Sequence, residues 1–223
     1  MNEFTFDSKV RRYRYASGDR SGQFVSNKDV IELVEKYMVQ QRGDISTITD
    51  DLLSDQITVD DWQSSVASNL KSLRINAYSL GRGGIGQLDS SDTAGLESRL
   101  EGEFEYLDKF AKEIEGGDLS DAHIKNRVTL YSDASYSEWQ LGSQAAAIDS
   151  GETFEIWDSA DDSTSCADCR GKAGLGWQPL GTLGVPGASV KCLSRCRCTK
   201  RFGTDRSGGE VGITIGSRDG WLL

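Results

Sequence analysis

The sequence predicts a mainly α-helical protein, with a helical body of three to four long helices and a small cysteine-rich α+β module near the C-terminus. Apolar residues recur at helical spacing through much of residues 26–150. No proline precedes Pro179, so long helices can run without a break. All five cysteines lie between Cys166 and Cys198, in a glycine-rich stretch. Extended segments are expected at both termini.

Composition is that of a globular chain without a membrane span. Hydrophobic residues make up 37% and charged residues 27% of the 223 residues, and no run of eighteen apolar residues occurs. The N-terminus lacks the basic start and apolar stretch of a secretory signal. We therefore expect the thiols to meet a reducing cytosol, which favours metal binding over disulfides.

Charge is unevenly distributed along the chain. The net charge is −10, but residues 29–162 hold 28 Asp and Glu against 10 Lys and Arg, a net of −18. Basic residues gather near the N-terminus and around the last cysteines. Those proposed to contact nucleic acid or an acidic partner are Arg11, Arg12, Arg14, Arg195, Arg197, Lys200 and Arg201. The alternative is a solvated surface, and an overall acidic protein is a poor non-specific DNA binder.

Residues 1–25 are expected to form an extended N-terminal arm that becomes ordered against another surface. Their aromatic and arginine residues follow no regular period. The helical body, residues 26–150, begins with Ser26 as a helix cap. We expect this first helix to end at Gly43, with a short helical turn near residues 49–54.

Three further helices are predicted in the body. Thr58 and its first-turn acids cap the second, which ends at residues 81–84. The third begins at Ser90 or Ser91 and ends at Gly116. Ser120 caps the fourth, which runs to about Ala147. Each is marginal alone and needs the apolar faces of the others.

The C-terminal module, residues 151–202, differs in composition from the helical body. Residues 153–157 alternate as in a strand. The glycine-rich stretch between the cysteine groups has too little apolar material to fold by burial alone, so the thiolates must hold it together. Residues 203–223 are expected to form a C-terminal tail.

The cysteine pattern predicts a structural zinc site. Cys166 and Cys169 have the two-residue spacing that lets two sulfurs converge on one ion. A tetrahedral site takes two more thiolates, which are Cys192 with either Cys196 or Cys198. All five are candidate ligands, and the alternative is a disulfide with free thiols.

No catalytic residue is expected, and we predict that the protein is not an enzyme. A cysteine nucleophile needs a base, and the only histidine is His123. The glycines of residues 81–84 lack the lysine and preceding strand of a phosphate-binding loop. Adjacent carboxylates such as Asp60 and Asp61 do not face each other on a helix.

The chain resembles the tailed-phage minor head proteins, also called head-morphogenesis proteins, over about residues 20–200. The order and spacing of several segments carry this resemblance. They are Gly22–Ser26, Ile57–Gln63, Tyr78–Gly84, Phe104–Ala111, Gly117–Ile124, Val185–Gly187 and the cysteine pattern.

The resemblance implies a structural protein of the virion head or neck, present in the host cytoplasm during assembly. Its implied partners are portal, major capsid or neck proteins in a multi-copy assembly that acts in head assembly and in genome packaging or delivery. Contact with packaged DNA is a further expectation. The metal ligands that the resemblance implies for this chain are its five cysteines, although Cys192 lies near the position where many relatives have a histidine. Alternatives are a head–tail connector ring protein and a zinc-containing nucleic-acid-binding adaptor.

Overall fold

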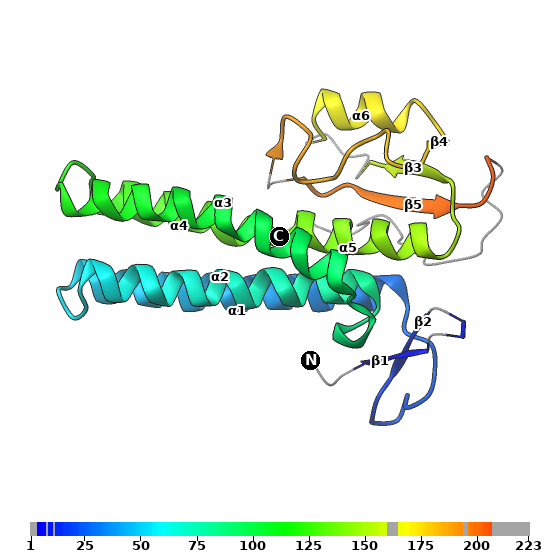
Figure 1. The fold of residues 1–223 in the computed structure, drawn as a ribbon, viewed down its shortest axis with the longest axis horizontal. Helices are drawn as coiled ribbons and strands as arrows, with labels where there is room; N and C mark the ends of the chain where they lie inside the picture. The colour runs from blue at the N-terminus through cyan, green and yellow to red at the C-terminus, as the bar shows by residue number, and fades with distance from the viewer. Residues whose placement is uncertain (1–3, 8, 11, 160–164, 194–195, 207–223) are drawn as a thin grey trace.

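The computed structural model describes residues 4–7, 9–10, 12–159, 165–193 and 196–206. Figure 1 shows an elongated body of long helices lying side by side, with a small sheet and a short helix packed over one end. The chain is mainly helical, as predicted. The body helices are α1 (Asn27–Leu53), α2 (Val59–Arg82), α3 (Ser90–Glu115), α4 (Asp121–Asp133) and α5 (Ser135–Asp149), with a 3-10 turn η1 (Ile85–Gln87) before α3.

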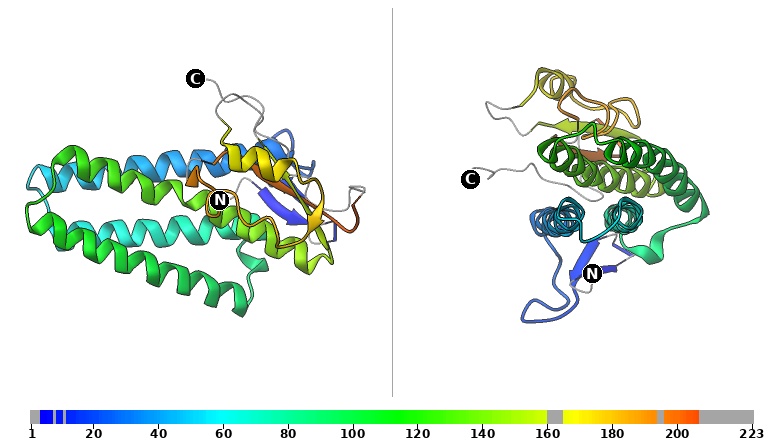
Figure 2. Two further views of the ribbon diagram at one scale, coloured as in Figure 1. Left: turned by 90° about the horizontal axis from the view of Figure 1, so that it is seen from above. Right: turned by 90° about the vertical axis from the view of Figure 1, so that its left-hand side faces the viewer.

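Two layers make up the body. Helices α1 and α2 form one layer and α3, α4 and α5 the other (Figures 1 and 2). Trp62, fully buried, packs edge-on against Phe110 of α3 with ring centroids 5.5 Å apart. A second apolar cluster, nearer the start of α1, includes Tyr136 and Trp139 of α5.

Reciprocal caps fix the starts of three helices. Ser26, Thr58 and Asp89 each accept a hydrogen bond from a backbone N–H of the first turn, and the aspartate three residues later faces the cap in return. The predicted starts of the first two helices are confirmed, and the third begins at Ser90 behind the Asp89 cap. Ser120 caps α4 as predicted.

The predicted end of the first helix at Gly43 is wrong. Helix α1 continues through Gly43 to Leu53 and includes the turn expected at residues 49–54. Buried Ile45 and Leu52 extend its apolar face beyond the glycine. A glycine in a helix interior costs only about 1 kcal/mol, so this packing outweighs it.

The predicted fourth helix is divided at Ala134 into α4 and α5. Hydroxyl groups on both sides of the division hydrogen-bond to backbone carbonyls: Ser132 donates to Thr129, Ser135 to Ser132 and Ser137 to Ala134. Side chains that compete in this way for helix carbonyls favour a break.

Residues at the N-terminus form a hairpin of β1 (Phe4–Asp7) and β2 (Arg12–Tyr15), paired antiparallel with Phe6 opposite Tyr13. The Tyr13 hydroxyl donates to the carbonyl oxygen of Leu80 at 2.6 Å in a buried position. The surface against which the arm is ordered is therefore the chain's own helical body. The hairpin and the C-terminal module lie on opposite faces of that body (Figure 2).

The C-terminal module contains a three-stranded antiparallel sheet in the order β4-β3-β5. Its elements are β3 (Phe154–Asp158), α6 (Ala167–Ala173), β4 (Gln178–Pro179) and β5 (Thr199–Gly203). The strand expected at residues 153–157 is thus present as β3. Helix α5 lies beneath β5 (Figure 1). Of the predicted tail, residues 207–223 lie outside the described residues.

None of the helices described here combines the length and the apolar character that crossing a membrane requires.

Candidate metal centre

Two segments of the module bring the five cysteines together. Cys166 caps α6 and Cys169 lies in its first turn, so the helix fixes the distance between them. Cys192, Cys196 and Cys198 belong to the segment that leads into β5. The backbone N–H of Cys169 donates to the Cys166 sulfur at 3.4 Å, which is the contact expected of a two-cysteine knuckle.

The sulfur atoms lie at distances suited to a metal ion. The Sγ–Sγ distances are 3.5 Å for Cys166 and Cys192, 3.6 Å for Cys169 and Cys192, and 3.7 Å for Cys169 and Cys196. A zinc–sulfur bond of about 2.3 Å gives a tetrahedron with edges of about 3.8 Å. The residues present therefore fit a thiolate-bound ion, and no described cysteine is in a disulfide.

The sulfurs form two groups of three. Cys166, Cys169 and Cys192 make one group, and Cys169, Cys196 and Cys198 make the other. Within each group, all sulfurs lie within 4.8 Å of one another. Cys169 belongs to both groups, and its sulfur is therefore the one they share.

The cysteines differ in burial and in the pKa of their thiols. Cys169, Cys196 and Cys198 are buried, packed with Trp157, whereas Cys166 and Cys192 are partly exposed. Burial raises the pKa of the Cys169 thiol, and the contact with Cys198, together with burial, raises that of Cys196. Although burial opposes it, the hydrogen bond from the Cys169 N–H lowers the pKa of Cys166. Without an ion the Cys169 and Cys196 thiols hold their protons, so binding a metal there would release them.

The cluster is attached to the helical body through α5. The Tyr136 hydroxyl, from α5, donates to the carbonyl oxygen of Cys198 at 3.1 Å. Gln140, one turn later on the same helix, donates to the Tyr136 oxygen at 3.2 Å. Both side chains are almost completely buried, so buried hydrogen bonds join the cysteine segment to the body.

Lys200 forms a second buried attachment between module and body. Its ammonium group contacts Glu155 of β3 at 2.7 Å, Gln144 of α5, and the carbonyl oxygen of Gly184 at 2.8 Å. Glu155 also accepts the Leu183 N–H at 2.6 Å. Burial lowers the pKa of Lys200, while the ion pair with Glu155 opposes that shift.

The prediction that Lys200 contacts nucleic acid or a partner is wrong. Its side chain and that of Glu155 are both 0% exposed. A lysine beside cysteines in a basic run gives no sequence signal for burial, because its partner Glu155 is distant in the chain. The signal that could have suggested the pair is the alternation of side chains between the two faces of each strand, once β3 and β5 are paired antiparallel.

The other basic residues are placed as follows. Arg201 makes two hydrogen bonds to Asp158 across the sheet, at 2.5 and 2.9 Å. Arg12 and Arg14 of the hairpin both lie over the ring of Phe24, 4.2 and 3.8 Å from its centroid. Arg197 is half-buried in the cysteine segment. Arg11 and Arg195 lie outside the described residues. The two basic clusters are therefore not one surface, because the hairpin and the module lie on opposite faces (Figure 2).

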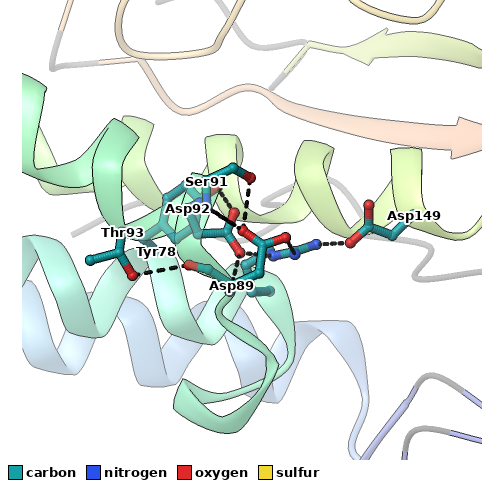
Figure 3. A network of polar contacts seen from close by, with 7 residues as sticks. Tyr78, Asp89, Ser91, Asp92, Thr93 and Asp149 are labelled. Carbon is teal, nitrogen blue, oxygen red and sulfur yellow. Dashed lines mark hydrogen bonds and ion pairs between the residues drawn. The ribbon is translucent and has the colours of Figure 1, made fainter.

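A polar network that sequence reasoning missed joins α2, α3 and α5 at the end of the body near the hairpin (Figure 3). Buried Arg82 donates to Asp92 at 2.7 Å and to Asp149 at 2.5 Å. The Tyr78 hydroxyl donates to Asp92 at 2.5 Å. Asp92 also faces the Asp89 cap, so the network fixes the start of α3 against the end of α2.

No family model, curated protein or solved structure matches this chain. The functional interpretation therefore depends on the geometry of the chain's own residues.

Proposed function

We propose that the protein is a structural component of a tailed-phage head, of the minor head class, whose C-terminal module is held together by zinc. The observation that carries the proposal is the convergence of five cysteines in a module fastened to a long helical body. Such a module offers portal, capsid or neck proteins a rigid contact surface. The order of segments that resembles minor head proteins supplies the virion assignment.

The zinc ligands proposed are Cys166, Cys169, Cys192 and Cys196. Three of the sulfur–sulfur distances in this set, 3.5 to 3.7 Å, approach the edge of a zinc–thiolate tetrahedron. Cys198 then remains the fifth thiol, buried beside the ion. Four protein ligands close the coordination sphere, as in structural rather than catalytic zinc sites.

A structural role also agrees with the position of the histidine. His123 is exposed in the first turn of α4. The turn between α3 and α4 lies at the end of the body away from the C-terminal module (Figure 1). His123 is therefore remote from the thiols that a general base would have to activate.

A nucleic-acid-binding role is less well supported. Of the basic residues near the last cysteines, Lys200 is buried and Arg201 is paired with Asp158. The chain as a whole carries a net charge of −10, which opposes phosphate binding.

The virion assignment is tested by mass spectrometry of purified heads from the virus that encodes this chain. We expect peptides of the protein at a few copies per head. A full symmetric ring of copies would instead identify a connector, and absence from complete heads would exclude the virion role.

The zinc assignment is tested by native mass spectrometry of freshly prepared, reduced protein. One zinc per chain is expected, and a strong chelator should remove it. A protein that carries no metal while its module remains folded would contradict the zinc proposal.

A further inference from the structure

We propose that the five thiols also form a two-ion centre for a soft monovalent metal such as Cu(I), with the Cys169 sulfur bridging the two ions. The inference deepens the metal centre of the proposed function and rests on the same thiol cluster, but not on the virion role. One ion would be held by Cys166, Cys169 and Cys192, and the other by Cys169, Cys196 and Cys198.

The number and grouping of the sulfurs support this arrangement. Two tetrahedral ions that share one sulfur need seven ligands, whereas two three-coordinate ions that share one sulfur need five. The cluster supplies five, in two groups of three with Cys169 common to both. A single zinc ion uses four of the thiols, whereas two three-coordinate ions that share Cys169 use all five.

The chemistry of the donors selects the ion. All five donors are thiols, which as thiolates prefer soft metals, and Cu(I) is one of the ions that such ligands select. Two Cu(I) ions binding to five thiols release five protons and leave a centre with a charge of −3. No electron is transferred in this step, because the copper enters and remains as Cu(I).

The surroundings suit an ion that must be kept from water. Cys169, Cys196 and Cys198 are at most 3% exposed and pack with Trp157, Leu183 and Val190. Cys166 and Cys192 are partly exposed, which gives an ion from solution access to the first group. Among the described residues, the buried Trp157 indole N–H has no hydrogen-bond partner, although Trp157 belongs to the same apolar cluster as the inner cysteines.

The test is a titration of the full-length, reduced, metal-free protein with Cu(I) in acetonitrile-containing buffer under nitrogen, followed by native mass spectrometry. We expect two Cu(I) per chain, and X-ray absorption should show each copper bound by three sulfurs. One Cu(I) per chain, or more than two, would overturn the proposal.

Variants separate the two ions. Cys166→Ser should remove only the first ion and Cys198→Ser only the second, leaving one Cu(I) in each case. Cys169→Ser should weaken both. Cys198→Ser that still binds two Cu(I) would overturn the assignment, and circular dichroism of each variant checks that the helical body is folded.

A parallel zinc titration distinguishes this inference from the proposed function. Cys198→Ser should still bind one zinc, because Cys198 is outside the proposed zinc set. One zinc per chain with a Cu(I) stoichiometry other than two defeats the two-ion centre alone. Two Cu(I) per chain in a protein that is absent from heads defeats only the virion role.

Discussion

Gly81 of α2 and Gly142 of α5 lie where the backbones of the two helices touch, and neither position has space for a side-chain carbon. A Cβ at Gly81 would lie 2.2 Å from the carbonyl oxygen of Trp139, and one at Gly142 would lie 2.2 Å from that of Tyr78. Because α5 carries the attachments to the module, this crossing determines where the module lies on the body.

Gly142→Ala should therefore destabilise the protein. The two helices must separate to admit the methyl group, and overpacking of this kind costs about 1–3 kcal/mol. Gly43→Ala is the matched control, because a Cβ there meets no atom within 4 Å. It should stabilise α1 by about 1 kcal/mol. Urea unfolding followed by circular dichroism measures both, and equal effects of the two substitutions would contradict the close helix crossing.

Lys200→Met should destabilise the module strongly. The substitution leaves the Glu155 carboxylate buried without its cation, and breaking a buried pair in this way costs about 3–5 kcal/mol. Lys125→Met removes an ion pair to Asp50 that is more than half exposed on both sides, so it should have little effect. Thermal unfolding compares the two variants. A small effect at Lys200 would mean that its ammonium group is not enclosed between β3 and α5.

Removing the proposed metal should loosen the C-terminal module and leave the helical body intact. The module lacks apolar material for independent folding, whereas α2 is buried among the other helices. Hydrogen exchange with and without chelator is the measurement. Amides of β3 and α6 should exchange faster after chelation, and those of α2 should not. Uniform acceleration over the whole chain would show that the body also depends on the metal.

Acid should weaken the start of α3 through Asp89. Hydrogen bonds from the Asp92 N–H and from Ser91 lower the pKa of Asp89 below its ordinary value of 3.8. The carboxylate thus contributes stability that is fully present above pH 3.8 and is lost as the pH falls through the lowered pKa. Asp89→Asn keeps a capping side chain but does not titrate.

The melting temperature of the wild type, compared with Asp89→Asn, should fall more steeply below pH 4. Curves that remain parallel down to pH 2 would contradict a capping role for the ionised carboxylate.

Local signals predicted most of the helical body, because each helix cap and each apolar stripe depends on residues close together in the sequence. Thr58 and Ser120 cap the helices expected of them. Gly43 misled the prediction because a glycine is a strong local signal for a helix end, whereas the packing that overrides it comes from other helices. The break at Ala134 depends on several serine hydroxyls acting together, which helical periodicity does not register.

The candidate site was predictable only as a set of residues. Cysteine spacing identified the five thiols, but their division into two groups depends on how Cys192, Cys196 and Cys198 fold back on α6. The burial of Lys200 and the hairpin contact of Tyr13 with Leu80 both arise from pairs distant in sequence. The sequence around either residue of such a pair contains no repeating pattern that would predict the contact.

The antiparallel pairing of β3 with β5 closes residues 159–198 into a loop that contains every cysteine of the chain. Drawing together the ends of a free segment this long carries a length-dependent entropy cost of about 3 kcal/mol. Where the strands are paired, part of that cost is already met, and the cysteines are confined to a smaller volume. Binding of the proposed ion and formation of the sheet would thus be thermodynamically linked, and weakening the Asp158–Arg201 end of the sheet is expected to lower metal affinity without altering a ligand.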